Sequence, residues 1–227
     1  MNRYSRHTML PEIGEEGQQK IRQAKVLVVG AGGLGSPALL YLAAAGVGKI
    51  GIIDADCVSL SNLQRQVLYQ ENQLGMPKAE KAKENLSALN SECTIESYCF
   101  NLDENNAFDL ISAYDMVLGA TDNFASRILI DQCCKKQEKP FIHASVSEYE
   151  GQLSVFNYNG GNSYADLFPE SGEDSAPATG ILGVLPGVMG CLMATEALKI
   201  ILGIGEVLSN RLLIYNSLTA QSTILEF

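Results

Sequence analysis

Basic side chains are scarce in this chain of 227 residues, and two features of exported or membrane proteins are missing from it. Lys and Arg number 16 against 26 Asp and Glu, giving a formal charge of −10, so phosphate backbones and anionic lipid surfaces would repel the protein. The start, MNRYSRHTML, has no apolar core of a signal peptide. The apolar stretch at residues 181–204 is interrupted by Pro186, Glu196, Lys199 and several glycines. We therefore expect a cytoplasmic protein that binds neither nucleic acid nor membranes.

Paired cysteine motifs are also missing. None of the six cysteines forms a CxxC pair, and none clusters in the sequence with the two histidines, His7 and His143. We therefore expect no structural zinc and interpret the cysteines as buried free thiols in a reducing compartment. Both histidines are interpreted as residues with satisfied hydrogen bonds at the edge of the fold. The cysteines are Cys57, Cys93, Cys99, Cys133, Cys134 and Cys191.

Apolar runs rich in Val and Ile alternate with helical patterns through the first two thirds of the chain. This alternation predicts an α/β fold with a Rossmann-like, doubly wound, mostly parallel sheet, whose strands are apolar because both faces are covered. The predicted strands are residues 25–30, 49–54, 94–100, 115–122 and 140–146, and the predicted helices are residues 34–46, 78–89, 107–114 and 124–137.

The pattern changes after residue 146. Residues 151–158 alternate as an antiparallel strand does, and residues 159–179 are rich in Gly, Ser, Asn, Asp and Pro, which predicts a mobile crossover loop. A helix at Val188–Leu202 and two short strands, 211–216 and 222–227, follow. We therefore expect a single domain over residues 1–227, with a nucleotide-binding part at 1–146 and an antiparallel part at 147–227.

A glycine-rich turn joins the first predicted strand to the first predicted helix. Glycines in the sequence GAGGLG allow phosphate to approach backbone amides at a helix N-terminus, where the helix dipole favours negative charge. Asp54 ends the second strand, at the position where a ribose-binding carboxylate is expected. These features predict a nucleotide site; the alternative is a tightly packed turn with Asp54 as a cap at the strand end. The turn glycines are Gly30, Gly32, Gly33 and Gly35.

The loop after Asp54 carries the sequence SNLQRQ, and Lys78 follows at the start of the next helix. Asn62, Arg65 and Lys78 could converge on a triphosphate, where fixed cations stabilise charge that develops at phosphorus. A dehydrogenase needs no such set of groups there. The alternative is a solvated loop beside a lysine whose charged end reaches water.

The fourth predicted strand ends in ATDN, at the edge of the sheet where ligands of open α/β folds bind. Asp122 could hold Mg²⁺ through one carboxylate and several waters. The alternative for Asp122 or its neighbour Asn123 is a cap for the helix that follows, and the two residues could divide these roles.

These blocks, together with GVLPGVMGCLMATEALKIILG, closely resemble the ThiF/MoeB/HesA family, bacterial relatives of ubiquitin-activating enzymes. The resemblance runs from RYSRHTML to RLLIYN. It implies a homodimeric adenylyltransferase that binds ATP and Mg²⁺. The implied substrate is the C-terminal Gly-Gly carboxylate of a small ubiquitin-like sulfur carrier, in thiamine or molybdenum-cofactor synthesis. The C-terminal sheet is where the family places that carrier.

The resemblance also implies roles for individual residues. Asp54 would hold the ribose, Asp122 would bind the metal or position the attacking carboxylate, and Arg6 would reach the ATP site of the partner subunit. Arg6, Asn62, Arg65, Lys78 and Asp122 are thus the predicted catalytic residues. The predicted nucleotide-binding residues are Gly30, Gly32, Gly33, Gly35, Asp54, Ser61, Asn62, Leu63, Gln64, Arg65, Lys78, Asp122 and Asn123.

The sequence departs from the family at two places. Ser163 and Asp166 stand where many relatives have the first CxxC pair of a zinc site, and no second pair is present. The crossover loop also lacks the cysteine that some relatives link to the carrier, and Cys191 lies in a helix of buried character. Adenylation is therefore the leading hypothesis. The alternatives are a non-catalytic binding protein, adenylation of another substrate such as a tRNA base, and an NAD-dependent oxidoreductase.

Overall fold

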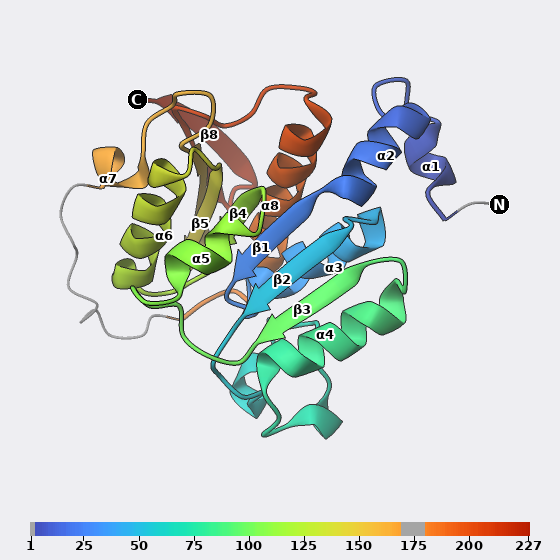
Figure 1. The fold of residues 1–227 in the computed structure, drawn as a ribbon. Helices are drawn as coiled ribbons and strands as arrows, with labels where there is room; N and C mark the ends of the chain where they lie inside the picture. The colour runs from blue at the N-terminus through green and yellow to red at the C-terminus, as the bar shows by residue number, and fades with distance from the viewer. Residues whose placement is uncertain (1–2, 169–179) are drawn as a thin grey trace.

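The computed structural model describes residues 3–168 and 180–227, which form one mixed β-sheet with helices on both faces (Figure 1). In this part of the chain the sheet has eight strands in the order β3-β2-β1-β4-β5-β6-β7-β8. The first five in that order run parallel, and β6, β7 and β8 continue the sheet antiparallel. Their bounds are β1 Lys25–Val29, β2 Lys49–Ile53, β3 Thr94–Tyr98, β4 Met116–Gly119, β5 Phe141–Ser147, β6 Glu150–Phe156, β7 Arg211–Asn216 and β8 Gln221–Glu226. The predicted fold class is confirmed.

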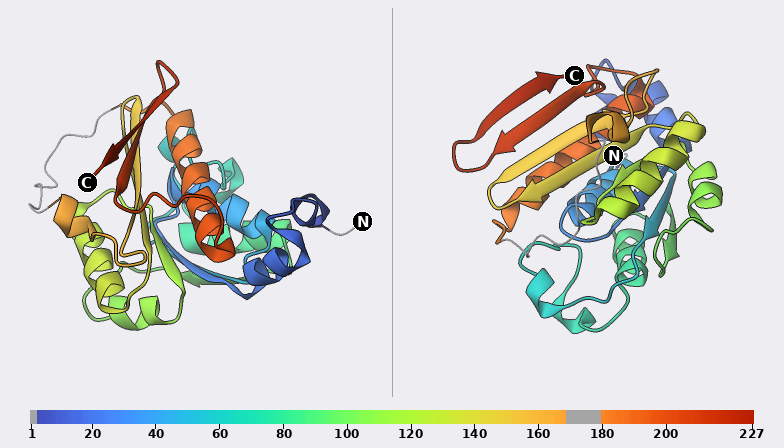
Figure 2. Two further views of the ribbon diagram at one scale, coloured as in Figure 1. Left: turned by 90° about the horizontal axis from the view of Figure 1, so that it is seen from above. Right: turned by 90° about the vertical axis from the view of Figure 1, so that its left-hand side faces the viewer.

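Helices cover the two faces of the sheet in separate layers (Figure 2). One layer holds α3 (Gly35–Ala45), α4 (Lys78–Leu89) and α8 (Val184–Leu202), and the other holds α5 (Ala107–Ser112), α6 (Phe124–Lys136) and α7 (Tyr164–Leu167). Two N-terminal helices, α1 (Ser5–Thr8) and α2 (Gly14–Gln23), come before the sheet, and α2 packs against α8. Two short 3₁₀ turns, η1 (Leu60–Asn62) and η2 (Glu71–Gln73), lie in the loop between β2 and α4.

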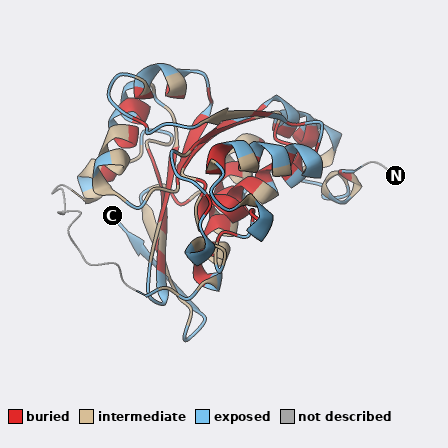
Figure 3. Ribbon diagram, turned by 90° about the horizontal axis from the view of Figure 1, so that it is seen from below, coloured by how far each residue is buried: buried red, intermediate tan, exposed pale blue. Residues whose placement is uncertain are grey.

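The alternation of side chains along β1 divides the interior into two cores. Val26 and Val28 belong to the cluster beneath α3, α4 and α8, whereas Leu27 and Val29 belong to the cluster beneath α5, α6 and α7. All four are buried, and the central strands appear as a continuous buried band in Figure 3. Burial on both faces explains why these strands read as unbroken apolar runs.

Helix α8 begins at Val184, four residues before the predicted start at Val188. Pro186 lies in the first turn, where its missing N–H has no helical partner to lose, so it does not interrupt the helix as the sequence suggested. By length and composition alone, with 19 residues and a mean hydropathy of 1.6, α8 could cross a membrane. In this fold it packs against α3, β5 and β6, with Met189 and Met193 fully buried.

Two regions contain structure that the sequence pattern did not predict. Helices α1 and α2 fill the N-terminus, where buried Tyr4 accepts a hydrogen bond of 2.9 Å from Asn90 Nδ2. Part of the predicted mobile loop, residues 159–179, is helical, because α7 spans Tyr164–Leu167. The rest of that prediction, residues 169–179, lies outside the described residues.

Candidate nucleotide site

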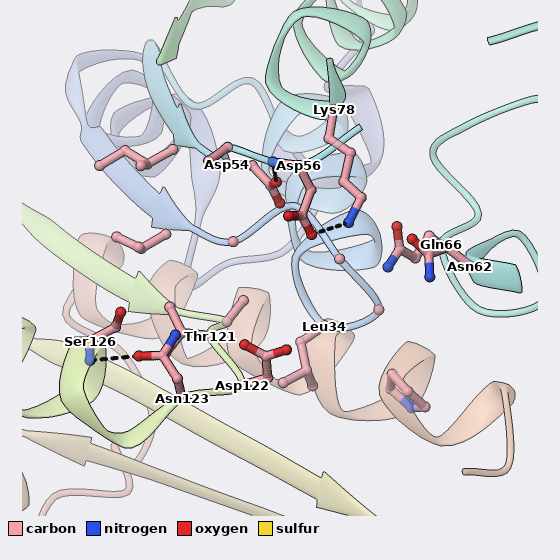
Figure 4. Close-up of a pocket in the computed structure, with 18 of the residues that line it drawn as sticks. Leu34, Asp54, Asp56, Asn62, Gln66, Lys78, Thr121, Asp122, Asn123 and Ser126 are labelled. Atoms are coloured by element: carbon pink, nitrogen blue, oxygen red, sulfur yellow. Dashed lines mark hydrogen bonds and ion pairs between the residues drawn. The ribbon is translucent and has the colours of Figure 1, made fainter. Parts of the chain in front are cut away.

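A cavity of about 460 Å³ lies at the carboxyl ends of β1, β2 and β4 (Figure 4). The order of the strands reverses here, because β2 lies on one side of β1 and β4 on the other, and ligands of open α/β sheets bind at such points. The structure brings nine of the predicted residues to the wall of this cavity. They are Gly30, Gly32, Gly33, Asp54, Asn62, Arg65, Lys78, Asp122 and Asn123.

Several other predicted residues do not line the cavity. Ser61, Leu63 and Gln64 lie in or beside η1, next to cavity residues. Gly35 supports the fold instead of facing a ligand, because a Cβ atom at this position would overlap the carbonyl oxygen of Gly30. Arg6 is exposed on α1, and it is not a lining residue of the cavity in its own chain.

The glycine-rich turn brings bare backbone to the cavity. Gly30 has φ of +95°, which a residue with a side chain rarely adopts, and a Cβ atom there would overlap the carbonyl of Ala120. The Gly30 N–H donates to Ile53 O at 2.8 Å, so the turn is tied to the end of β2. The turn leads directly into α3, which places a helix N-terminus beside the cavity.

Asp54 fastens the turn to β2 through its carboxylate. Oδ2 accepts a hydrogen bond from Ala31 N–H at 2.8 Å, and Oδ1 accepts one from Asp56 N–H at 2.9 Å. Burial raises the pKa of the Asp54 carboxyl group, and the two N–H donors partly offset this shift. Each oxygen keeps a further lone pair, so Asp54 can act both as the predicted cap and as an acceptor for a ligand.

Lys78 is the first residue of α4, and its side chain is only 5% exposed. Its Nζ lies 2.9 Å from Asp56 Oδ2 in an ion pair. Lys78 is therefore a buried cation on the cavity wall, which contradicts the alternative of a lysine that reaches water. Asp56 was not among the predicted residues, although the Asp-x-Asp pattern after β2 is visible in the sequence.

The SNLQRQ segment turns back on itself at the mouth of the cavity. The N–H groups of Arg65 and Gln66 both donate to Asn62 O, at 3.0 and 2.9 Å, and Arg65 Nη1 donates to Ser61 O at 3.2 Å. Gln66 also lines the cavity, and its buried Oε1 has no hydrogen-bond partner among the described residues. The sequence analysis did not single out Gln66. A buried amide oxygen without a partner, beside a glycine-rich turn, can accept a hydrogen bond from a polar ligand.

Asp122 and Asn123, the two candidates for a metal ligand or a helix cap, have different surroundings in the structure. Asn123 Oδ1 accepts a hydrogen bond from Ser126 N–H at 2.8 Å and thereby caps α6. Asp122 is exposed and makes no hydrogen bond or ion pair with another described residue, and Figure 4 shows its carboxylate in the cavity. A free carboxylate next to a glycine-rich turn that can bind phosphate suits Mg²⁺, which binds one or two protein carboxylates together with substrate phosphates.

Arg127 and Thr121 form part of the cavity wall beside α6, and Arg127 Nη2 donates to Thr121 O at 3.1 Å. Behind them, His143 of β5 is buried, and its Nδ1 has no partner among the described residues. Burial lowers the pKa of His143 well below its usual value, and the Arg127 charge adds to this effect. The prediction of a satisfied histidine at the edge of the fold is therefore wrong for His143. For His7 the pairing is present, because its Nδ1 lies 3.0 Å from Gln18 Oε1.

The cysteines of the two long helices do not have the environment of an activated thiol. Cys133 and Cys134 are buried in α6, and Cys191 is partly buried in α8. Burial raises the pKa of all three thiols, which disfavours the nucleophilic thiolate. The interpretation of these cysteines as structural agrees with this environment.

Ser163 and Asp166, which stand where the family resemblance implies a CxxC pair, form a polar cap at the start of α7. The Asp166 carboxylate accepts hydrogen bonds from the Ser163 N–H and hydroxyl groups at 2.8 and 2.7 Å. Buried Asp131 of α6 accepts from the N–H groups of Tyr164 and Ala165, at 2.8 and 3.2 Å. Within residues 3–168 and 180–227, no group of three or more His, Cys, Asp or Glu side chains could hold a metal ion.

A mostly parallel sheet, a glycine-rich turn at its switch point and an acidic residue after β2 define a Rossmann-like α/β protein. The chain belongs to the ThiF family, whose pattern matches residues 4–227. It is 47% identical over 222 residues to a probable molybdopterin-synthase adenylyltransferase of Porphyra purpurea, covering 96% of this chain and 58% of that protein. It is 43% identical over 229 residues to the sulfur carrier protein adenylyltransferase of Thermus thermophilus, covering 97% of this chain and 84% of that protein.

The fold is also similar to a solved structure. The crystal structure of E. coli MccB with ATP superposes with a TM-score of 0.87 at 24% identity, over 100% of this chain and 71% of that chain. This likeness concerns the fold alone. The chain spans less than two thirds of the length of several curated relatives, including 58% of the Porphyra protein and 48% of a Zea mays protein.

Proposed function

We propose that this chain adenylates the C-terminal Gly-Gly carboxylate of a ubiquitin-like sulfur carrier, using ATP and releasing pyrophosphate. The observation that carries the proposal is one cavity that combines a glycine-rich turn, a buried lysine, Arg65 and a free carboxylate at Asp122. The relatives named above, 47% and 43% identical, carry the name adenylyltransferase, which supports the same reaction. The relative from Porphyra purpurea favours molybdenum-cofactor synthesis over thiamine synthesis as the pathway.

The proposed reaction is an in-line attack by the carrier carboxylate on the α-phosphorus of ATP. A bond forms between a carboxylate oxygen and phosphorus, the bond to the bridging oxygen breaks, and pyrophosphate leaves with the electron pair. A carboxylate is ionised at pH 7, so the attack needs no general base and no protein nucleophile. Catalysis then consists of positioning two anions and stabilising the charge that develops between them.

The cavity residues fit the parts of this reaction. The backbone of the glycine-rich turn, Asn62, Arg65 and Lys78 would bind and neutralise the phosphates. The free lone pairs of Asp54 would accept hydrogen bonds from the ribose hydroxyl groups. Asp122 would hold Mg²⁺, which when bound neutralises part of the phosphate charge.

We also propose that the protein acts as a cytoplasmic homodimer in which Arg6 completes the site of the partner subunit. Arg6 is exposed on α1 and does not line the cavity of its own chain, so a role in the same subunit has no support. If the proposal is correct, an Arg6→Ala subunit and an Asp122→Ala subunit, mixed together, regain part of the activity that each lacks alone.

The experiment that tests the function is ATP–pyrophosphate exchange with purified protein, Mg²⁺ and small carriers ending in Gly-Gly. Each carrier is compared with the same carrier lacking its last glycine. Exchange that requires the intact tail supports adenylation and identifies the carrier. Binding of Mg-ATP without exchange for any carrier would favour a non-catalytic relative, and exchange supported by a tRNA would favour the other adenylation substrate.

A further inference from the structure

Asp56 joins the two charged parts of the cavity through three contacts. Its N–H donates to Asp54 Oδ1 at 2.9 Å, and its carbonyl oxygen accepts from Lys78 N–H at 2.8 Å. Its carboxylate Oδ2 forms the 2.9 Å ion pair with Lys78 Nζ, drawn as a dashed line in Figure 4. Asp56 therefore ties the end of β2 to the start of α4, and it orients the side chain that the start of α4 carries.

The exposure of the two partners is unequal. The Lys78 side chain is 5% exposed, whereas the Asp56 side chain is 75% exposed. A buried ammonium group needs a counter-ion, because the loss of its hydration is expensive without one. The Asp56 carboxylate stays hydrated. When a phosphate binds to Lys78, the Asp56 charge is therefore not left buried without a counter-ion.

The ammonium group of Lys78 still has hydrogen-bonding capacity. It carries three donors, and among the described residues Nζ makes its hydrogen bond to Asp56 alone. The remaining donors belong to a residue of the cavity wall. Asp56 thus fixes the direction of one donor, and this choice sets the directions of the other two.

We propose that Asp56 is a positioning residue that holds Lys78 in register for the phosphates during the reaction. The inference rests on the proposed adenylation, and it adds a residue that acts through Lys78 without touching the reacting atoms. A lysine on a flexible four-carbon stem loses side-chain entropy when it is held in one geometry. Because the ion pair with Asp56 already holds Lys78, little of this entropy remains to be lost when ATP binds.

Two simpler roles for Asp56 predict different results. A negative charge that only lies close to the phosphates would weaken ATP binding, so its removal would lower the dissociation constant and leave kcat unchanged. A residue that only supports the start of α4 would change the melting temperature and leave kcat unchanged. A positioning role predicts a fall in kcat with little change in ATP affinity.

The experiment compares Asp56→Asn and Asp56→Ala with a matched control in the full chain. The control is Glu84→Gln, which removes the partner of Lys81 in a 2.7 Å ion pair on the same helix, at residues that do not line the cavity. We expect kcat for exchange to fall about tenfold in Asp56→Asn and further in Asp56→Ala, since small misplacements of catalytic groups have effects of this order. We expect ATP affinity within about threefold of wild type, and Glu84→Gln within about twofold in both.

A double-mutant cycle tests whether Asp56 acts through Lys78. In a Lys78→Ala background, Asp56→Asn should cause no further loss of kcat, because the group that it positions is gone. The same fold-loss in both backgrounds would overturn the proposal, and so would a kcat of Asp56→Asn equal to that of wild type.

A second measurement does not depend on activity. The rate at which an amine-acylating reagent modifies Lys78, followed by peptide mass spectrometry, should rise several-fold in Asp56→Asn and stay unchanged in Glu84→Gln. An unchanged rate at Lys78 would contradict the positioning role. Failure of the proposed function itself would be recognised separately, as a wild-type protein with no tail-dependent exchange.

Discussion

The central parallel strands of the sheet and its antiparallel edge at β8 differ in how deeply their residues are buried. All four residues of β4 and the last four of β1 are buried, whereas all six residues of β8 are exposed. The turn glycines predicted to bind the nucleotide follow β1, and the acidic and basic residues predicted to bind it follow β2 and β4. The two halves of one continuous sheet are therefore built for different tasks.

This difference shows where rigidity is required. Small groups such as the Asp54 carboxylate and the Lys78 ammonium must be fixed within fractions of an ångström, and strands covered on both faces provide such supports. The β7–β8 hairpin contains no residue that is predicted to bind the nucleotide, so its surface is available to bind another molecule. The predictions below test this contrast, beginning with the largest expected effect.

Removal of a phosphate-binding cation should separate the two halves most clearly. We expect Arg65→Ala or Lys78→Ala to lower the rate of carrier-dependent exchange about 100-fold or more, the scale of a single electrostatic donor. Arg211→Ala in β7, which removes a surface ion pair to Glu206, should leave the rate at saturating carrier within about twofold. Exchange assays with melting temperatures as a fold control provide the measurement. Normal exchange by Arg65→Ala would contradict the assignment of the site.

Glycine substitutions in two helices test where close packing is essential. Gly35→Ala should destabilise the protein by about 2–3 kcal/mol, because its new Cβ atom overlaps the Gly30 carbonyl. Gly187→Ala in α8 meets no atom of the described residues within 4 Å and should stabilise the protein by about 0.5–1 kcal/mol. Urea unfolding measures both values. Equal effects at the two positions would show that the glycine-rich turn is not tightly constrained.

Asp131 should hold the segment around α7 to α6. Asp131→Asn keeps the size of the side chain and loses the charge. We expect the free energy of unfolding to fall by about 2 kcal/mol, because buried N–H donors lose a charged acceptor.

A zinc chelator should leave the melting temperature of the wild-type protein unchanged. A melting temperature that falls with chelator would instead indicate a metal that contributes to folding.

His143 should make the stability depend on pH in the mildly acidic range. Its pKa is lowered in the folded protein from the usual value of 6.5, so the unfolded state binds the extra proton below that pH. Stability should therefore fall as pH decreases from 6.5 to 5, by about 1.4 kcal/mol per pH unit at most. Denaturant unfolding of His143→Gln should lack this component, and His7→Gln should retain it. The same slope in both variants would assign the effect to other groups.

The sequence was sufficient to predict the parts of the site that lie at the ends of strands. Strand ends could be located from apolar runs, and the ends of neighbouring parallel strands must meet at one edge of the sheet. Gly30, Asp54 and Asp122 follow such strand ends, and the structure places all three on the cavity wall. The sequence left both Asp122 and Asn123 as candidates for the helix cap, and the Asn123–Ser126 hydrogen bond of the structure decides between them.

The residues that were missed depend on contacts between distant segments. The ion pair of Asp56 forms across 22 positions, and the unsatisfied amide of Gln66 is visible only once the loop has folded over the turn. The burial of His143 depends on α6 and α7, which pack over β5 from different parts of the chain. The role proposed for Arg6 requires a second subunit, so the structure of a single chain does not test it.

Strand β8 has a consequence for the dynamics of the molecule. Among the described residues its strand partner is β7 alone, and all six of its residues are exposed, so few contacts are lost when it separates from the sheet. Its amide protons should exchange with solvent through local opening, whereas those of β1 should exchange only when the whole domain unfolds. Amide exchange would then rise in steps from the middle of the sheet to this edge. One continuous sheet would thus contain more than one cooperative unit.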